Sequence, residues 1–557
     1  MKIFLRSTSF LLPKSNSWND IEKNHKLIFS NYGDIFSNSK PNEKFDCEIF
    51  VIFLNDLIDY FNAKKANQKK ELLKCKKIIE VIEKKLSSNA RTNFIMSFST
   101  YYYFNYLNES KSFSYIKKIK FYFTQQLYIL SKKYSNFFVL DIDDLFAQYG
   151  YDKCYDQKNY FTLRCRLSTL GIEILSKCLN NLILKIYKTN KKVLLLDCDE
   201  TLWGGIVGED GLKNLKLGGD GIGLAYVEFQ KAIKKIKETG IIIALLSKNN
   251  ESDVKQVLEK HQFMILKNKD IAAFKVNWKE KSFNIRQLSK ELFLGLDSFV
   301  FWDDNPIERQ KVRIQLKGVD VIEPDKDVTN WPKQLLEYKG FSKFYISKED
   351  ADKTKQYKKR TIFLDNKSSA KNEIDYLKKI NIKPKLIKLN NSNLVRSEQM
   401  CQKTNQFNFN TKRYKMNDLT YLNKKNFLFL VDLTDDYGKH GIVGQFILKK
   451  YNNILLVDLF LMSCRIMGRY LENWMLSEIK KIATKEKIKE IIFEFVPTKK
   501  NITIIKNYIK INKFEKMNSK NLKKLLNGKK QKSILNSSAE YYSFNPKKKI
   551  INLEVYK

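Results

Sequence analysis

Two aspartates and a threonine stand at a place in the chain where they could act on phosphate. Asp197 and Asp199 follow the apolar run VLLL (193–196), and Thr201 comes two positions later. The run predicts a buried strand, and ligands of open α/β sheets bind beyond the carboxyl ends of strands. One carboxylate there can attack a phosphoryl group while the other exchanges a proton with the leaving group. Neighbouring carboxylates also favour a hard cation with oxygen ligands, and Mg²⁺ is suited to them.

Three later segments supply the remaining groups of such a site. Ser247 ends the apolar run IIIALLS (241–247), where a hydroxyl and neighbouring N–H groups can hold phosphate oxygens, with Lys248 beside it. Lys281 begins a predicted helix and can neutralise phosphate charge, and Asp303 and Asp304 end the run SFVFW (298–302). We expect phosphate to be bound by Thr201, Ser247, Lys248 and Lys281, and the metal by Asp197, Asp199, Asp303 and Asp304.

The spacing of these segments bears on the substrate. About fifty residues separate Asp197 from Ser247, and about thirty-four separate Ser247 from Lys281. Neither interval is long enough for a large cap domain. An open site is therefore expected, which favours a bulky or protein-borne substrate.

Three regions with different patterns surround and contain these motifs. Strand-like runs alternate with helical periodicity in the first region (CEIFVIFL at 47–54, TNFIMSF at 92–98, NFFVLDIDDLF at 136–146, and a helix at 65–87), which predicts an α/β domain with a mostly parallel sheet. The second has strands at 193–197, 241–247 and 298–305 with helices near 224–239, 251–260 and 280–293. The third has closely spaced strands at 427–435, 444–450, 454–462 and 490–495 and a helix at 467–485, which predicts an α+β domain.

From this pattern we expect four segments. They are an α/β domain at 1–187, the catalytic domain at 188–340, a lysine-rich helical connector at 341–384 and an α+β domain at 385–557.

Composition narrows the class of protein. The 557 residues carry a formal net charge of +41, but the excess is almost entirely lysine, since only twelve arginines are present, and lysine occurs throughout the chain. Lysine spread over solvated helix faces explains this better than a nucleic-acid surface does, so no nucleic-acid partner is expected.

Eight cysteines without a CxxC pair and three histidines argue against a zinc cluster. Arg6 interrupts the apolar N-terminus and no apolar run reaches eighteen residues, so we expect a cytoplasmic protein without a membrane span.

The motifs closely resemble the FkbH-like branch of subfamily IIIC of the haloacid dehalogenase (HAD) superfamily. The segments that carry the resemblance are DCDETLWGGIVGEDG (197–211), AAFKVNWKEKSFNI (272–285), FWDDNPIER (301–309), KTNQFNFNTKRY (403–414), DDYGKHGIVG (435–444), SCRIMGRYLE (463–472) and PTKKN (497–501). Together they span roughly residues 135 to 515. One departure is Glu200, where the family commonly has asparagine.

The resemblance implies an activity. FkbH-like proteins dephosphorylate 1,3-bisphosphoglycerate and load the glyceryl unit onto an acyl carrier protein as a thioester. By this match Asp197 is the nucleophile or principal metal ligand, and Asp199 is the general acid/base, with its backbone carbonyl facing Mg²⁺. Lys281 neutralises charge, and Asp303 binds the metal with support from Asp304. Acyl transfer can pass through an enzyme thiol, for which Cys198 and Cys464 are the candidates.

The resemblance also extends to the flanking domains. The third region is similar to GNAT-type acyltransferases. In this chain the segment RIMGR (465–469) follows a predicted strand and opens a predicted helix, whose N–H groups can bind a phosphate. Arg465, Gly468 and Arg469 are therefore candidates for binding the carrier's phosphopantetheine. The first region resembles the SGNH-hydrolase-like domain of long family members, but it has no GDS motif and no histidine in YDQKNYFT (155–162), so a non-catalytic role is expected.

Two other functions stay open at this point. The first is a simple phosphatase whose third domain only binds a partner. The second is a non-enzymatic protein that binds polyanions through its charge. The intact carboxylate set argues against the second of these, and only the family resemblance argues against the first.

Overall fold

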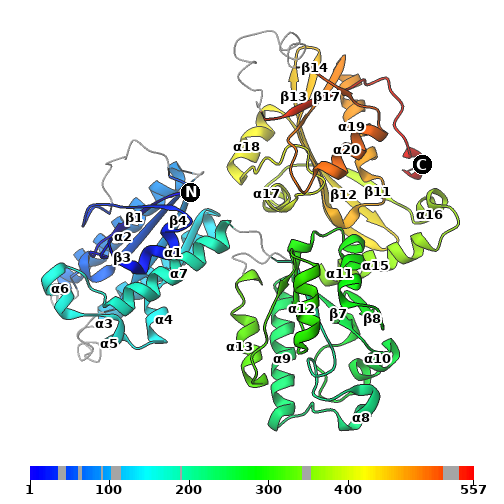
Figure 1. The fold of residues 1–557 in the computed structure, drawn as a ribbon. Helices are drawn as coiled ribbons and strands as arrows, with labels where there is room; N and C mark the ends of the chain where they lie inside the picture. Colours follow the sequence, from blue (N-terminus) through cyan, green and yellow to red (C-terminus); the bar gives the residue numbers. More distant parts are fainter. Residues whose placement is uncertain are drawn as a thin grey trace. The chain divides into compact units, whose positions relative to one another are not determined.

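The chain forms two compact units, Met1–Lys188 and Thr189–Lys557. The computed structural model describes residues 1–35, 45–59, 65–89, 92–101, 114–187, 191–341, 353–518 and 538–556. None of the helices in these ranges combines the length and the apolar run that a bilayer crossing requires. The expected fold class, α/β units followed by an α+β unit, is confirmed (Figure 1).

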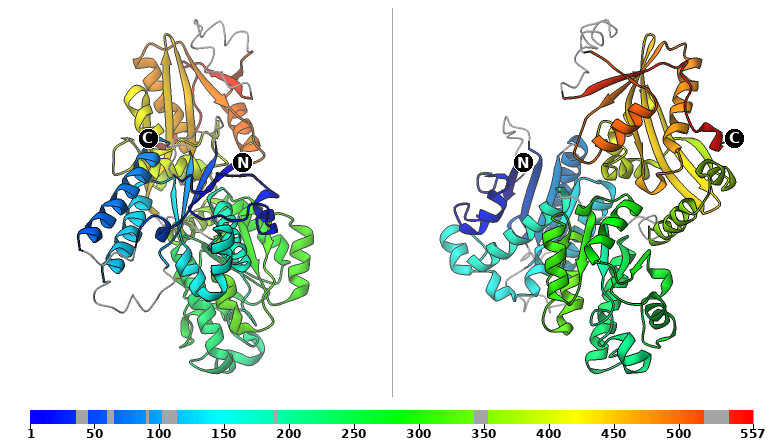
Figure 2. Two further views of the ribbon diagram at one scale, coloured as in Figure 1. Left: turned by 90° about the vertical axis from the view of Figure 1, so that its left-hand side faces the viewer. Right: turned by 45° about the vertical axis from the view of Figure 1, so that its right-hand side comes forward.

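The first unit is a parallel sheet between two layers of helices. Its strand order, β2-β1-β3-β4-β5, is that of flavodoxin-like folds. Helices α2 and α3 cover one face and lie side by side, blue and light blue in Figure 2, and α1, α4 and α7 cover the other. The elements are β1 (Lys2–Ser7), α1 (Asn19–Glu22), β2 (Lys26–Phe29), β3 (Cys47–Phe53), α2 (Lys65–Ser88), β4 (Asn93–Ser99), α3 (Ser114–Lys133), β5 (Phe137–Asp141), α4 (Ile142–Ala147), α5 (Tyr151–Cys154), α6 (Gln157–Leu163) and α7 (Thr169–Tyr187).

The second unit begins with a parallel five-stranded sheet, which we call the central sheet, in the order β10-β9-β6-β7-β8. All four residues of β6 are buried, as expected for a middle strand with helices on both faces. Helices α9, α10 and α13 pack on one face, and α11 and α12 pack on the other. The elements are β6 (Val193–Leu196), α8 (Val207–Asn214), α9 (Gly221–Glu238), β7 (Ile242–Ser247), α10 (Glu251–Lys260), β8 (Ala273–Val276), α11 (Lys281–Leu292), β9 (Phe299–Trp302), α12 (Pro306–Gln315), β10 (Asp320–Val321) and α13 (Trp331–Leu336).

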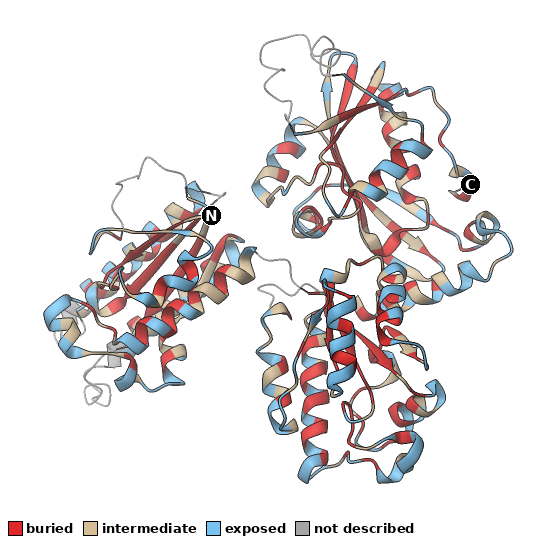
Figure 3. Ribbon diagram, viewed as in Figure 1, coloured by how far each residue is buried: buried red, intermediate tan, exposed pale blue. Residues whose placement is uncertain are grey.

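The same unit ends with a mixed seven-stranded sheet, which we call the C-terminal sheet. Its order is β11-β12-β13-β14-β15-β17-β16, and its pairs are antiparallel except β14 with β15. The strands of both sheets are mostly buried, whereas the outward faces of the helices are exposed (Figure 3). The elements are β11 (Lys383–Lys388), α17 (Leu394–Lys403), α18 (Met416–Lys425), β12 (Phe427–Asp435), β13 (Gly438–Tyr451), β14 (Ile454–Met462), α19 (Leu471–Lys485), β15 (Glu490–Phe495), α20 (Ile502–Ile511), β16 (Glu515–Lys516) and β17 (Glu540–Phe544).

Helices α15 (Lys353–Ser368) and α16 (Glu373–Lys379) lie in the segment between the two sheets, where helices were predicted. The α15 side chains reach both neighbours. Tyr357 packs into the core of the central sheet, and Phe363 packs into the core of the C-terminal sheet. Arg360 donates to the carbonyls of Glu291 at 3.1 Å and Arg465 at 2.6 Å. The connector is therefore a packed helix rather than a loose link.

Three predicted elements need correction. The strand expected through residue 146 ends at Asp141, because that carboxylate caps helix α4 by accepting from the backbone N–H groups of Asp143 and Asp144. The helix expected from residue 467 begins at Leu471, because Gly468 and Tyr470 have φ values of +92° and +57°. The strand expected from residue 444 begins at Gly438, directly after a tight hairpin turn.

Candidate active site

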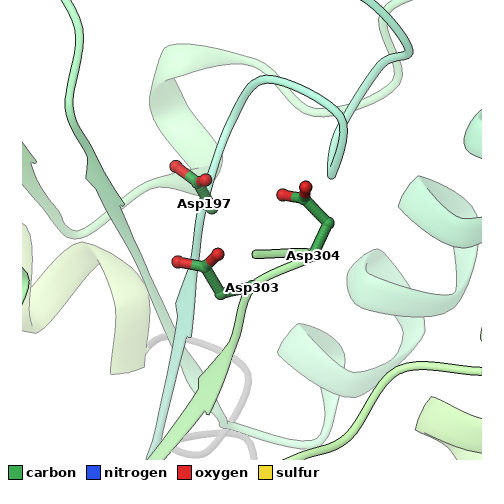
Figure 4. A group of neighbouring side chains, drawn as sticks. All are labelled: Asp197, Asp303 and Asp304. Atoms are coloured by element: carbon green, nitrogen blue, oxygen red, sulfur yellow. The ribbon is translucent and has the colours of Figure 1, made fainter. Parts of the chain in front are cut away.

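Three carboxylates meet at the carboxyl end of the central sheet. Asp197 follows the middle strand β6, and Asp303 and Asp304 follow its neighbour β9. The strands are held in register there, since the Asp197 N–H donates to the Trp302 carbonyl at 3.1 Å. One oxygen from each carboxylate lies within 4.8 Å of the others (Figure 4). The motif that contains Asp197 and the motif that contains Asp303 and Asp304 thus meet in the structure, as predicted.

Lys281, the first residue of α11, reaches into this cluster. Its Nζ lies 2.9 Å from Asp197 Oδ2 and 2.6 Å from Asp303 Oδ2, and its side chain is buried. Burial alone would lower the pKa of Lys281, but Asp197 and Asp303 outweigh it and raise that pKa. The ammonium therefore stays charged and neutralises part of the carboxylate charge.

The single positive charge of Lys281 does not neutralise the three carboxylates of the cluster. Burial, followed by repulsion from Asp197, raises the pKa of Asp303 to about 7 and also raises the pKa of Asp304. Asp197 Oδ1 is buried without a hydrogen-bond partner. An unpartnered carboxylate oxygen among three carboxylates fits a hard divalent cation with oxygen ligands.

Asp199 is oriented differently from the other aspartates. Its Oδ1 accepts from Trp203 Nε1 at 2.8 Å and from the Val207 N–H at 3.1 Å, and its Oδ2 accepts from Asn249 Nδ2 at 2.7 Å. The carboxylate is not a member of the three-carboxylate cluster. The side-chain oxygens are occupied by other donors, so a metal contact of Asp199 through its backbone carbonyl stays a prediction. Burial raises the pKa of Asp199, which favours a proton on the group.

The predicted phosphate-binding residues fall into two sets. Thr201 is fully buried and donates from Oγ1 to Asp304 Oδ1 at 3.1 Å, beside the cluster. Ser247 ends β7 at the same edge of the sheet, and its hydroxyl is hydrogen-bonded with the Cys198 thiol. Lys248 instead pairs with Glu308 Oε1 at 2.9 Å. Thr201 and Lys281 thus lie in the cluster, while Ser247 and Lys248 stand at its edge with other partners.

Glu200, where the sequence departs from the motif it resembles, has a left-handed backbone conformation. Its φ is +52°, in the left-handed region where asparagine is several-fold enriched. Its Oε1 accepts from the Gly205 N–H at 2.8 Å, so the side chain stabilises the turn. Glutamate here accepts some backbone strain and contributes a turn hydrogen bond instead.

Several residues that position the site were not predicted. Trp203 and Asn249 hold the Asp199 carboxylate, and Arg309 donates through NH1 to the main-chain carbonyls of Asp303 and Asp304 at 2.8 and 2.5 Å. Asn305 donates its N–H to Asp303 Oδ1 at 2.9 Å. The sequence signal for all four is their position, since each lies one to five residues from the nearest predicted site residue.

The two candidate thiols lie in different places: Cys198 follows β6 of the central sheet, and Cys464 follows β14 of the C-terminal sheet and interacts electrostatically with Lys192. Cys198 is fully buried next to the catalytic aspartates, and burial, then Asp197 and Asp199, hold its pKa well above the usual value. Burial also raises the pKa of Cys464, and the positive charges of Lys192 and Arg360 partly offset this. Lys192 precedes β6 and Asp197 follows it, so roughly 16 Å of strand separates the two.

The loop predicted to hold a carrier's phosphate is tied to the protein itself. Arg465 NH2 donates to the His440 carbonyl at 2.6 Å, and Arg469 Nε donates to Asp435 Oδ2 at 2.7 Å. Both arginines are buried, and Gly468, with φ +92°, accepts from Lys367 Nζ through its carbonyl at 3.0 Å. These bonds stabilise the loop, and its role in binding a carrier stays a prediction.

A segment of the chain also occupies the fork between β14 and β15. The two strands pair only over Ile454–Val457 and Glu490–Phe493. Beyond that point the Phe409 N–H donates to the Phe460 carbonyl at 3.1 Å, and the Val496 N–H donates to the Phe409 carbonyl at 2.8 Å. The motif KTNQFNFNTKRY (403–414) therefore completes the sheet where its strands diverge.

No protein-family model and no curated protein matches the chain. Among solved structures, the crystal structure of the N-terminal part of the protein BF1531 from Bacteroides fragilis, which contains a phosphatase domain complexed with Mg, is similar. Its identity to this chain is 30% and its TM-score is 0.51, and the match covers 60% of this chain and 93% of that one. The chain belongs to the same family as this phosphatase-domain protein. Its HAD-like fold, with the carboxylate cluster at the carboxyl edge of the central sheet, agrees with that membership.

GNAT acetyltransferases match about 30% of the chain at lower scores. An acetyltransferase of the GNAT family from Staphylococcus aureus matches with a TM-score of 0.23 and 13% identity over 30% of this chain and 100% of that one. The ribosomal-protein-S18-alanine N-acetyltransferase from Escherichia coli matches with a TM-score of 0.22 and 10% identity over 31% of this chain and 99% of that one. At these scores the likeness adds nothing to the topology described above.

Proposed function

We propose that this protein is a Mg²⁺-dependent phosphoryl-transfer enzyme that dephosphorylates 1,3-bisphosphoglycerate and loads the glyceryl unit onto an acyl carrier protein as a thioester. The observation that supports the phosphoryl-transfer half is the cluster of Asp197, Asp303 and Asp304 around Lys281. The resemblance to FkbH-like proteins supports the acyl-transfer half.

In the proposed reaction Asp197 acts first. One of its carboxylate oxygens attacks the phosphorus of the 3-phosphate, and the bond from phosphorus to the glyceryl oxygen breaks. Asp199, which burial keeps prone to protonation, gives its proton to the departing oxygen. A water molecule then loses a proton to Asp199 and attacks the phosphorus of the aspartyl phosphate, which restores Asp197 and releases inorganic phosphate.

The positive charges serve the phosphoryl oxygens. Lys281 already faces two carboxylates and would share its N–H donors with a phosphoryl group beside Asp197. Asp197, Asp303 and Asp304 would hold Mg²⁺, together with the backbone carbonyl of Asp199. When bound, the ion supplies charge neutralisation for the carboxylates and the phosphoryl group. Thr201 and Ser247 would position the phosphoryl oxygens.

The acyl transfer uses the other phosphate of the same substrate. A thiolate attacks the C1 carbonyl, the acyl phosphate bond breaks, and a second inorganic phosphate leaves. Overall, one 1,3-bisphosphoglycerate, one carrier thiol and one water give the glyceryl thioester and two phosphates. The attacking thiol belongs to the carrier, or first to Cys464 or Cys198. Cys464 interacts with Lys192, and Lys192 and Asp197 stand at opposite ends of β6. This separation favours delivery of the carrier thiol on its mobile phosphopantetheine arm over direct acyl transfer from the carboxylate cluster to Cys464.

The part of the chain that contains the C-terminal sheet, and the first unit, would support this reaction without phosphoryl chemistry. The segment around Arg465, Gly468 and Arg469 is the proposed place for the carrier's phosphopantetheine, through backbone N–H groups, because the arginine side chains have internal partners. For the first unit we propose a structural or docking role. The proposed segments are 1–187, 188–340, 341–384 and 385–557, with the protein in the cytoplasm.

A phosphatase of a small phosphorylated metabolite, without acyl transfer, is the second candidate. The high pKa of both thiols favours it, because a protonated thiol is a poor nucleophile.

A measurement of phosphate release tests whether the protein is an enzyme or only a binding protein. Purified protein is incubated with freshly generated 1,3-bisphosphoglycerate, with and without Mg²⁺, and phosphate is measured over the spontaneous rate. We expect Mg²⁺-dependent release that the Asp197→Asn variant lacks. Equal release by the variant at unchanged melting temperature would contradict the assignment of the site.

A further inference from the structure

Helices α11 and α12 form a continuous outer surface next to the candidate active site. Both begin there, since Lys281 is the first residue of α11 and Asp303 and Asp304 lie just before α12. They pack on the same face of the central sheet, and Arg286 NH2 on α11 donates to the Gln315 carbonyl at the end of α12, at 3.1 Å. Figure 1 shows the two helices side by side.

This surface exposes large apolar side chains. Phe283 is 51% exposed on α11, and Ile307 and Ile314 are each 64% exposed on α12. Ile307 and Ile314 are seven positions apart and therefore lie on one side of the helix. Trp278, in the loop that leads into α11, is 71% exposed. Single exposed apolar residues are ordinary, but four around one site indicate a binding surface.

The same surface is strongly basic. The exposed charged residues of 278–292 and 305–317 are six cations and one carboxylate, Glu280. Two of the cations form ion pairs, Arg313 with Glu323 at 2.8 Å and Lys311 with Glu308 at 3.7 Å, and the other four lie outside these two pairs. The cations are Lys279, Arg286, Lys290, Lys311, Arg313 and Lys317. We call these cations and the four apolar residues the α11–α12 face.

We propose that the α11–α12 face docks an acidic protein domain that brings the acceptor thiol to the carboxyl edge of the central sheet. This inference rests on the proposed function, because it assumes that a protein-borne acceptor is used. Aromatic and aliphatic anchors surrounded by charge are typical of protein interfaces, and complementary charge sets orientation and association rate. Between Asp197 and Lys281 the only α-helix or strand added to the strands and the face helices of the sheet is the eight-residue helix α8, so this described part of the chain contains no cap domain.

The apolar residues decide between partner classes. A nucleic acid would use the cations but leave Phe283, Ile307 and Ile314 without partners, because its outer surface is phosphate and sugar. An acidic helical protein uses both kinds of residue. Nucleic-acid binding is therefore an alternative outcome of the test.

The test measures binding without catalysis. A fluorescently labelled, acidic holo-acyl carrier protein of the fatty-acid type is titrated with the full chain, without Mg²⁺ or 1,3-bisphosphoglycerate, at several salt concentrations. One variant combines Arg286→Glu, Lys290→Glu and Lys311→Glu. A control variant combines Lys231→Glu, Lys235→Glu and Lys260→Glu, three exposed lysines of α9 and α10, and changes the net charge equally. A third variant, Phe283→Ser with Ile307→Ser, removes the apolar anchors.

We expect the first variant to weaken binding by on the order of tenfold or more and the control to change it little. The apolar variant should weaken binding without changing its salt dependence, since it removes no charge. Equal losses of carrier binding in both charge variants would overturn the proposal, and so would no carrier binding by the wild-type protein. A labelled DNA duplex is titrated in parallel, and charge reversal that weakens only DNA binding would also overturn it. If the carrier binds as expected but gains no acyl group when Mg²⁺ and 1,3-bisphosphoglycerate are then added, the proposed function fails while the docking surface stands.

Discussion

The candidate active site has more negative than positive charge, and a cation would neutralise the excess on Asp197, Asp303 and Asp304. One ammonium faces two carboxylates at 2.9 and 2.6 Å, and Asp304 adds a third carboxylate within 4.8 Å. Like charges at such distances oppose each other's ionisation, and burial adds to the effect. The raised pKa of Asp303, about 7, expresses this imbalance.

The pH dependence of stability follows from that value. A carboxyl with an ordinary unfolded pKa near 4 and a folded pKa of about 7 holds a proton only in the folded state between these values. Without Mg²⁺, Asp303 therefore makes the free energy of unfolding fall as pH rises from about 4 to about 7. We expect the melting temperature of Asp303→Asn, relative to wild type, to rise by a few degrees between pH 5 and pH 8.

The cation should reverse this effect in the wild-type protein. Added Mg²⁺ should raise its melting temperature more at pH 8 than at pH 5, because protons compete with the ion, and should not raise that of Asp303→Asn. A difference between the two proteins that stays constant with pH would contradict the account of Asp303.

Asp199 allows metal binding to be separated from proton transfer. Its carboxylate is held by Trp203, Val207 and Asn249 and stands outside the cluster. We expect Asp199→Asn to lower kcat for a phosphate monoester by about 10²–10⁴-fold while the Mg²⁺ concentration for half-maximal thermal stabilisation stays near the wild-type value. The loss should be smaller for an acyl phosphate, whose leaving group needs less protonation. A large loss of Mg²⁺ affinity would mean that this side chain is a metal ligand after all.

At the scale of elements, α15 fixes the central sheet to the C-terminal sheet. Arg360 is 1% exposed and donates to carbonyls at the end of α11 and in the loop after β14. Removing its side chain would leave these buried carbonyls without donors.

We therefore expect Arg360→Ala to lower the free energy of unfolding of this unit by about 3–5 kcal/mol, measured by chemical denaturation. Lys359→Ala, one residue away on the exposed side of α15, is the matched control and should change it little. Comparable losses in both variants would show that Arg360 has no special part in joining the sheets.

The elements that carry the site could be predicted because their patterns are local. The apolar runs before Asp197, Ser247 and Asp303 have no other plausible reading than buried parallel strands, and such strands bring their carboxyl ends to one edge. Strands β12, β14 and β15 and helix α10 also have the predicted bounds. The short β8, the edge strands β11 and β16, and β17, which lies between β15 and β16, were missed, because their sequences carry little apolar periodicity.

Side-chain direction could not be predicted from the same patterns. Spacing put Asp199 near the metal, but a tryptophan and an asparagine from other turns decide where its carboxylate points. Likewise, nothing in the sequence shows that Arg465 and Arg469 have partners on α15, β12 and β13. Long-range partners of this kind depend on the tertiary fold.

At the scale of the whole molecule, the proposed metal-binding residues all belong to one of the two compact units. Met1–Lys188 has its own sheet and cores, and Asp197, Asp303 and Asp304 lie in Thr189–Lys557. A ligand stabilises only the unit that binds it, unless the units unfold together.

Calorimetry should therefore show two transitions, of which Mg²⁺ shifts one upward and leaves the other in place. The Asp303→Asn variant serves as the control, and in it neither transition should move. A single transition, or two that shift together, would contradict the independence of the units.

The most direct test of the proposed function is the intact mass of a pantetheinylated acyl carrier protein incubated with this protein, Mg²⁺ and freshly generated 1,3-bisphosphoglycerate, beside an Asp197→Asn control. The account predicts a gain in mass of one glyceryl group that requires Asp197. A phosphoglyceryl gain that is the same in both proteins would show acyl transfer without a role for the carboxylate cluster. No gain, with phosphate still released and the carrier shown to be competent, would contradict acyl transfer and leave the phosphatase.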